Sequence, residues 1–441
     1  MAELHSIGEA TPARPAPPQL GAFLQMGFRP LYLAGAGWAA ASIAIWIFVP
    51  TMVQGVMQGI LWHAHEMLWG FIATIAVGFL LTAGATWTGI NPLHRWPLGL
   101  LCCLWGFARL GFLMPGRFVF VLAAAADSAF FVLAGAAMLR AVLKSRNLRN
   151  YGVPWLLFAL GALDALYLRE TDVGNGLPEL MRFFEAALLC MAVLALLVAR
   201  RVIPFFAMRA LPGLVLPMHT RSGHFQIAAA TVAVALLLSG HGVLAAAPLA
   251  LAAAIGLLQT VAWQPWAARQ WPILWILHAG YALLNVGLLV AAARASGQTL
   301  RAAWPVHVIA MGGLSVLIIG MITRTALGHL GRALTLDRWM LGSLWLMLAA
   351  VALRLLALLP SAWAHGLLEG AAVCWIGAFS LFIWRFAPLM VRPRPDASAP
   401  FMPLSGTTGK GTTVTDKPHS GIQMQTRGPD KTSGATAPKV T

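Results

Sequence analysis

Charged residues are scarce in this 441-residue sequence: they make up 10% of it, whereas hydrophobic residues make up 59%. Because ordinary soluble domains contain about 25% charged residues, the composition excludes a soluble globular domain. The sequence also lacks a Gly-rich phosphate loop between a strand and a helix, and it lacks a nucleophile elbow. Any chemistry is therefore expected within the hydrophobic segments themselves.

Cysteine is rare as well. The four cysteines lie inside hydrophobic runs and form neither a C-x-x-C nor a C-x-x-C-H pattern: Cys102, Cys103, Cys190 and Cys374. Their spacing gives no indication of a thiolate metal site or of covalent c-type haem attachment. We therefore expect the cysteines to serve in packing.

Hydrophobic runs close to the roughly 20 residues that cross a bilayer recur along the chain. This pattern predicts an all-α, polytopic transmembrane helix bundle of about 12 spans. The expected spans are 28–50, 60–88, 97–114, 118–140, 152–169, 179–199, 224–240, 243–261, 272–294, 304–326, 339–359 and 363–386. Residues 1–27, which show no secretory signal, form a short N-terminal segment. Residues 387–441, rich in Thr, Gly, Pro, Ser and Lys, are expected to be a disordered tail.

The distribution of basic residues predicts that both termini are cytoplasmic. With the N-terminus inside, the inner loops hold Arg95, Arg140, Lys144, Arg146, Arg149, Arg200, Arg201, Arg209, Arg221, Arg269, Arg324, Arg332 and Arg338. The outer loops hold only Arg117, Arg169, Arg294 and Arg301. The positive-inside rule favours this orientation. Membrane topology and contact with anionic lipid headgroups account for the net charge of +16. We therefore exclude nucleic acid as a partner.

Histidines near the ends of the spans are the most informative residues. His63 and His65 begin the second span, His307 begins the tenth, and His278 and His329 lie near the ends of the ninth and tenth. A single such histidine is more often a hydrogen-bonded packing residue than a ligand. Five of them with an adjacent carboxylate, Glu66, favour ligand binding.

The expected topology divides these histidines by depth. His63, His65 and His307 belong to an outer layer, and His278 and His329 belong to an inner layer. His307 and His329 are separated by roughly 33 Å along a continuous helix at 1.5 Å per residue. These two histidines therefore cannot bind the same metal atom.

Helix geometry places His63 and His65 about 200° apart around a regular helix. Either the helix is irregular at this point, or the two rings have different partners. Glu66 shares a face with His63 at i, i+3, so it either orients that ring or relays protons. An ion pair between Glu66 and a buried arginine is the alternative.

Further charged residues lie within the spans, mostly in their outer halves. They are Arg109, Arg182, Arg354, Asp127, Asp164, Glu185 and Glu369. Some must be structural pairs, but charges at this depth commonly mark proton or ligand paths.

Several motifs resemble those of the NnrS family, bacterial inner-membrane proteins that respond to nitric oxide and contain haem and copper. The resemblance rests on Gly27-Phe28-Arg29-Pro30, Trp62-His63-Ala64-His65-Glu66-Met67, Gly78-Phe79-Leu80-Leu81-Thr82-Ala83, Trp87-Thr88-Gly89, Arg146-Asn147-Leu148-Arg149-Asn150, Arg201-Val202-Ile203-Pro204-Phe205-Phe206, His278-Ala279-Gly280-Tyr281, His307 and Thr323-Arg324-Thr325-Ala326-Leu327-Gly328-His329-Leu330-Gly331-Arg332. The sequence departs from the family pattern at Ala85-Thr86, where Pro-Asn is usual, and at Ala199-Arg200, where Gly-Gly is usual.

The resemblance implies b-type haem and copper, which suit a chain rich in histidine and poor in cysteine. We expect His278, His329 and Arg324 to bind haem. We expect His63, His65 and His307 to bind copper or a haem-iron and copper pair, with Glu66 as the catalytic proton relay. The resemblance also implies a protein that binds, detoxifies or reduces nitric oxide with an unidentified electron donor, in the bacterial inner membrane.

Two other functions are compatible with the sequence. One is a non-enzymatic membrane sensor of nitric oxide or a metal-handling protein. The other, which is less favoured, is a secondary transporter, for which two clear half-repeats would be expected and are not evident.

Overall fold

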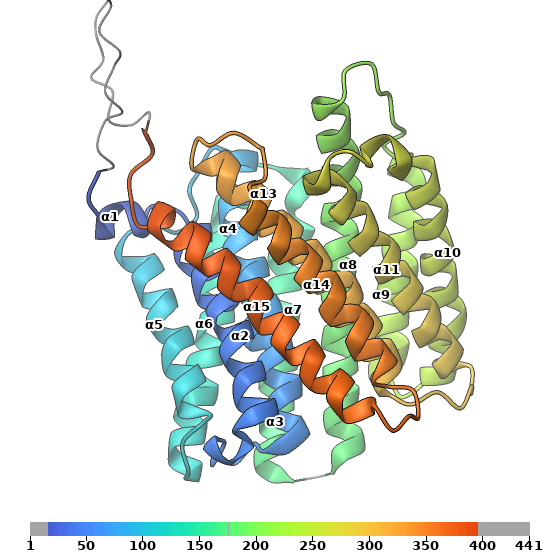
Figure 1. Cartoon of the computed structure of the whole chain (residues 1–441). Helices are drawn as coiled ribbons and strands as arrows, with labels where there is room; N and C mark the ends of the chain where they lie inside the picture. The colour runs from blue at the N-terminus through green and yellow to red at the C-terminus, as the bar shows by residue number, and fades with distance from the viewer. Residues whose placement is uncertain (1–15, 175, 396–441) are drawn as a thin grey trace, which may run out of the picture. The chain divides into compact units, whose positions relative to one another are not determined.

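The computed structural model describes residues 16–174 and 176–395, and this part of the chain is helical without a strand (Figure 1). The predicted all-α membrane bundle is confirmed. An α-helix satisfies its own backbone hydrogen bonds, which is why apolar segments of this length adopt it in a bilayer. Residues 1–15 and most of the expected C-terminal tail lie outside the described residues.

Eleven helices of the described chain are long and apolar enough to span a membrane. They are α2 (Phe28–Phe48), α3 to α4 (Gly59–Thr88), α6 (Arg117–Lys144), η3 with α7 (Leu148–Val173), α8 (Leu177–Ala210), α9 (Thr220–Leu238), η4 with α10 (Gly242–Ala262), α11 (Pro272–Ala295), α12 to α13 (Ala303–His329), α14 (Arg338–Leu356) and α15 (Ala364–Met390). A shorter apolar helix, α5 (Trp96–Gly111), is the counterpart of the expected span 97–114. The last helix continues to Met390 and so includes the first four residues of the expected tail, 387–390.

Two of these spans contain π-helical turns. Residues Glu66–Ala73 (η2) join α3 (Gly59–His65) to α4 (Thr74–Thr88), and Val308–Ser315 (η6) join α12 (Ala303–His307) to α13 (Val316–His329). At the end of each segment a hydroxyl group bonds to the carbonyl five residues earlier: Thr74 to Trp69 at 3.0 Å and Ser315 to Ala310 at 2.7 Å. Such turns are rare and often lie at functional sites.

The same two spans share a sequence pattern. The spacing Trp-x2-His-x4-Gly-x7-Gly-x10-Gly occurs from Trp62 to Gly89 and again from Trp304 to Gly331. Both final glycines have a positive φ, 71° at Gly89 and 67° at Gly331. Each therefore ends its helix in the left-handed conformation that glycine adopts most easily. The pattern indicates an internal repeat in which the two spans run in the same direction.

Glycine packing repeats along with the sequence. A Cβ atom added to Gly78 would lie 2.9 Å from the Leu31 Cβ, and one added to Gly320 would lie 2.7 Å from the Ile276 Cγ2. In the same way α2 approaches α4, and α11 approaches α13, through Gly35 and Gly280 respectively. Small residues of this kind allow membrane helices to approach closely.

The two repeated spans meet α8 in the interior of the bundle. The π-helical segments η2 and η6 contact each other, and both contact α8. The remaining helices lie around this trio, with α2 against α15 and α10 against α11 (Figure 1). The π-helical turns therefore lie where three central helices pack.

Candidate functional site

The start of the span Gly59–Thr88 carries His63, His65 and Glu66, and the structure directs the two histidines to different neighbours. The helix is regular up to His65 and becomes π-helical at Glu66. The His65 ring is fully buried, whereas His63 is only partly buried. The two imidazoles thus have separate environments, as their positions two residues apart on a helix require.

His65 lies in a buried cluster of charged side chains from four helices. Its Nδ1 is 2.8 Å from the Glu66 Oε1 and its Nε2 is 2.8 Å from the Asp164 Oδ1. Arg109 on α5 donates to the Glu66 Oε2 at 3.1 Å and also to Asp127 on α6. The five side chains are between 0 and 1% exposed. We call them the carboxylate cluster: His65, Glu66, Arg109, Asp127 and Asp164.

Glu66 does not orient His63, which the i, i+3 spacing suggested. Its two oxygens interact with His65, Arg109 and the Trp38 Nε1, which donates at 2.5 Å. The alternative interpretation, an ion pair with a buried arginine, describes its contacts. The change to a π-helical turn at Glu66 alters the angular spacing on which the i, i+3 expectation rested.

His63 and His307 lie near each other at the end of the bundle where their spans begin. Both are within electrostatic range of Arg354. The His63 ring stacks on Trp46, with ring centroids 5.1 Å apart and planes 11° apart, and its Nδ1 is buried without a hydrogen-bond partner. The His307 Nδ1 is 2.8 Å from the Ala303 carbonyl oxygen, so its Nε2 remains for another partner.

His278 lies within α11 and is 3% exposed. Its Nδ1 is 3.1 Å from the Leu274 carbonyl oxygen, and its Nε2 is buried without a hydrogen-bond partner, close to the backbone of Trp263. An imidazole held by a backbone carbonyl at one nitrogen, with no hydrogen bond of normal geometry at the other, resembles the usual arrangement of a metal-binding histidine.

His329 lies at the end of α13, where its ring is 5.4 Å from the ring of Phe28. Gly280 packs against Leu317, and Gly320 packs against Leu277, so His278 lies at the level of residue 319 on the antiparallel helix α13. His329 is ten residues further along that helix, or roughly 15 Å at 1.5 Å per residue. The structure therefore does not bring the two inner histidines to one point.

Several sequence motifs meet near His329. The Phe28 N–H donates to the Thr82 hydroxyl at 2.9 Å, and the Arg201 guanidinium donates to the Asn150 side chain at 2.7 Å. The Arg324 guanidinium lies 3.8 Å from the centre of the Phe206 ring. Residues up to about three hundred positions apart, such as Phe28 and His329, thus come into contact only after folding, which the sequence could not reveal by itself.

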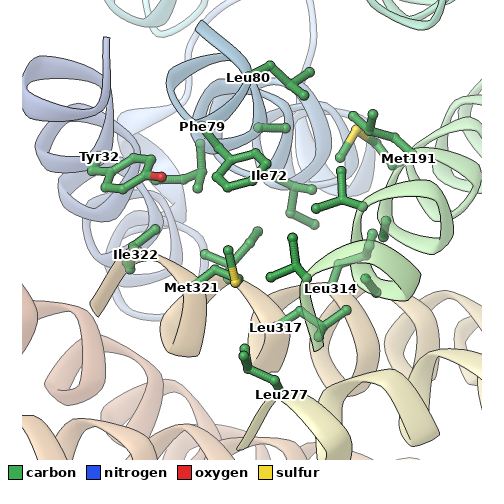
Figure 2. A pocket seen from close by; sticks show the side chains of 18 of the residues that line it. Tyr32, Ile72, Phe79, Leu80, Met191, Leu277, Leu314, Leu317, Met321 and Ile322 are labelled. Atoms are coloured by element: carbon green, nitrogen blue, oxygen red, sulfur yellow. The ribbon is translucent and has the colours of Figure 1, made fainter. Parts of the chain in front are cut away.

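A cavity of about 100 Å³ lies among the central helices (Figure 2). Its lining is apolar and comes from α2, α4, α8, α11 and the span that contains η6. Figure 2 shows Ile72, Phe79, Met191, Leu314 and Met321 around it. Since about 10–15 Å³ by this measure is enough for one water molecule, this apolar space suits small uncharged molecules.

Sequence analysis did not identify a second buried polar group. The Tyr281 hydroxyl is 2.6 Å from the Gln259 Oε1 and 3.1 Å from the Gln226 Oε1, and Gln226 donates to Asn285 at 3.1 Å. All four side chains are at most 1% exposed. Neutral amides give no charge signal in an apolar sequence, although inside a helix bundle they also need hydrogen-bond partners.

Comparison with known families identifies one match. The family described as NnrS protein matches residues 22–394, which is most of the chain. A search of curated proteins finds no match. The matched region includes all the histidines discussed above.

Proposed function

Because this multi-pass membrane protein belongs to the NnrS family, a family of nitric-oxide-response proteins, we propose that it binds and removes nitric oxide with the help of b-type haem and copper. The observation that carries the proposal is the His278 imidazole, whose Nε2 is buried without a hydrogen-bond partner. A buried polar atom without a partner is costly unless a ligand satisfies it.

His278 is the residue that we propose would hold haem iron. Its Nδ1 is fixed by the Leu274 carbonyl, so the ring orientation is set before a ligand binds. Haem iron, when bound, supplies the site to which nitric oxide coordinates. His329 and Arg324 remain candidates for haem binding, but the roughly 15 Å between the two histidines along the helix argues against both binding one iron.

Copper is proposed to bind at His63 and His307. Imidazole suits copper, and each ring has a nitrogen that is free of a backbone or carboxylate partner. His65 differs because both of its nitrogens are close to carboxylates. We therefore place His65 outside the proposed copper site.

The apolar cavity is the proposed resting place of nitric oxide inside the bundle. Nitric oxide is small and uncharged, so it enters the lipid and apolar cavities readily. Tyr32 contributes the polar end of this cavity, and its hydroxyl is 3.1 Å from that of Thr325 (Figure 2). Ile72 of η2 and Leu314 of η6 line the cavity, which links it to both π-helical segments.

The proposed location is the bacterial inner membrane with both termini in the cytoplasm. Residues Asn150 and Asp172 lie near opposite ends of α7 (Gly152–Val173). Reporter fusions after these two residues are expected to lie on opposite sides of the membrane, with Asn150 inside. Fusions with equal sidedness would contradict the topology on which the outer and inner layers depend.

The test of the haem proposal is the haem content of purified variants. His278→Ala is expected to lose most of its haem and its spectral response to nitric oxide. His241→Ala is the matched control, since His241 lies exposed in the loop after α9. Full haem and an unchanged spectrum in His278→Ala would show that this histidine serves only in packing.

The copper proposal has a separate readout. His63→Ala and His307→Ala are each expected to lose copper and keep haem, whereas His65→Ala is expected to keep copper. A further assay measures whether the wild type consumes nitric oxide when a chemical reductant is supplied. A reductase would consume it, using two electrons and two protons per pair of nitric oxide molecules, whereas a sensor would not. The physiological electron donor would be a further partner.

A further inference from the structure

The carboxylate cluster has an excess of negative charge. Glu66, Asp127 and Asp164 contribute three carboxylates, whereas Arg109 contributes one fixed positive charge and His65 contributes at most one more. The neighbouring Tyr167 hydroxyl donates to the Leu61 carbonyl and adds no charge. At least one negative charge therefore lacks a partner in a fully buried setting, which is energetically costly.

Two oxygen atoms in the cluster also lack a donor. The Asp127 Oδ1 and the Asp164 Oδ2 are buried and have no hydrogen-bond partner among the described residues. Both side chains are at most 1% exposed. Their lone pairs are therefore available to a ligand that is positively charged.

The spacing of three side chains suits a metal ion. The His65 Nε2 is 2.8 Å from the Asp164 Oδ1 and 3.6 Å from the Asp127 Oδ2, and one ligand atom of each residue lies within 4.8 Å of the other two. Zinc binds nitrogen and carboxylate oxygen at about 2.0–2.2 Å, so two of its ligand atoms lie about 3–4 Å apart. The Asp127 Oδ2 also accepts from Arg109, so small movements of the two carboxylates that present their unpaired oxygens would bring one ligand atom of each residue to one ion.

Glu66 provides the carboxylate to which a metal-binding histidine usually donates its second ring N–H. Its Oε1 lies 2.8 Å from the His65 Nδ1, so it can fix the tautomer in which Nδ1 carries the proton and Nε2, which faces the Asp164 carboxylate, carries the lone pair. Trp38 and Arg109 hold the other oxygen of the same carboxylate. This arrangement is a carboxylate–histidine pair directed at Asp127 and Asp164.

We propose that the carboxylate cluster binds one divalent cation, zinc or manganese, through the His65 Nε2 and the carboxylates of Asp127 and Asp164. With His65 neutral, the cation and Arg109 balance the three carboxylates and leave no net charge. One imidazole with two carboxylates favours these ions over cuprous copper, which prefers softer ligands. The site is separate from the proposed haem and copper sites and does not depend on them.

The test is the divalent-metal content of the full-length protein, purified without chelators and measured by mass spectrometry. Stripped protein is then titrated with zinc alone and with manganese alone. The wild type is expected to bind one equivalent. Asp164→Asn is expected to lose this binding, whereas Asp172→Asn, which changes a more exposed carboxylate paired with Arg117, is expected to keep it.

A second variant keeps the proposal falsifiable if Asp164→Asn does not fold. Glu66→Gln leaves the three proposed ligands in place, so binding is expected to weaken by about 10- to 100-fold. His241→Ala, which changes an exposed histidine in the loop after α9, is expected to bind zinc or manganese as the wild type does.

Three outcomes would overturn the proposal. The first is a wild-type protein that contains neither ion and binds neither ion. In that case, an infrared band of a protonated carboxyl group that disappears in Asp127→Asn would identify a bound proton as the compensating charge. The second is binding that survives in folded Asp164→Asn. The third is an unchanged affinity in Glu66→Gln.

Discussion

Removing the positive charge of Arg109 is expected to destabilise the bundle strongly. The guanidinium is 1% exposed and contacts both Glu66 and Asp127. Arg109→Met preserves much of the side-chain volume but leaves two buried carboxylates without their counter-charge. Breaking a buried ion pair from one side costs about 3–5 kcal/mol, because the remaining charge cannot be solvated.

Thermal unfolding in detergent measures this cost. With an unfolding entropy of about 2.1 cal/mol/K per residue, a loss of this size lowers the midpoint by roughly 4–6 °C for a bundle of this length. Combining Arg109→Met with Glu66→Gln and Asp127→Asn is expected to restore most of the midpoint, since neutral partners need no counter-charge.

The control is Arg117→Met, because Arg117 is 74% exposed and its pair with Asp172 faces solvent. This variant is expected to keep the wild-type midpoint. The reasoning is refuted if Arg109→Met unfolds at the same temperature as the control, or if the triple variant is no more stable than Arg109→Met alone.

Two further predictions concern packing and capping. Gly280→Ala is expected to lower the free energy of unfolding by about 1–3 kcal/mol, because the new Cβ would lie 2.8 Å from the Leu317 backbone nitrogen. The control is Gly106→Ala, which is expected not to destabilise the protein because its new Cβ meets nothing within 4 Å. Equal unfolding midpoints for the two variants would contradict this prediction. Burial raises the pKa of Asp337, but hydrogen bonds from Arg385 and two helix amides outweigh it and lower that pKa. This carboxylate therefore stabilises the folded protein fully at a pH above its ordinary, unfolded-state pKa of about 3.9. The stabilisation is lost as the pH falls through the lowered pKa of the folded state. Asp337→Ala should cost about 1 kcal/mol at pH 7, and a gap in stability that persists at lower pH would contradict the assignment.

The helices were predictable because hydrophobic length alone determines a membrane span. The expected span 304–326 differs by only a few residues from Ala303–His329. Helix α5 ends at Gly111, earlier than expected, because the residues after it turn towards Gly55 instead of continuing the helix. Their backbones approach so closely that a Cβ atom added to Gly55 would lie 2.4 Å from the Phe112 carbonyl oxygen, which is less than a normal contact distance.

The side-chain partners were less predictable. The opposition of His63 and His65 followed from helix geometry, but the partners of Glu66 did not, since the π-helical turn that begins there has no clear sequence signal. The pairing of Arg109 with Asp127 depends on how α5 packs against α6, which hydropathy does not encode. Roles in binding haem and copper remain predictions for every histidine named.

The most direct test of the proposed function is the optical spectrum of the purified, reduced wild-type protein before and after anaerobic addition of nitric oxide. We expect b-type haem bands that shift when nitric oxide is added, with copper present in the same preparation. A preparation that folds, carries neither haem nor copper, and shows no spectral change would contradict the proposal that this protein handles nitric oxide through a metal centre.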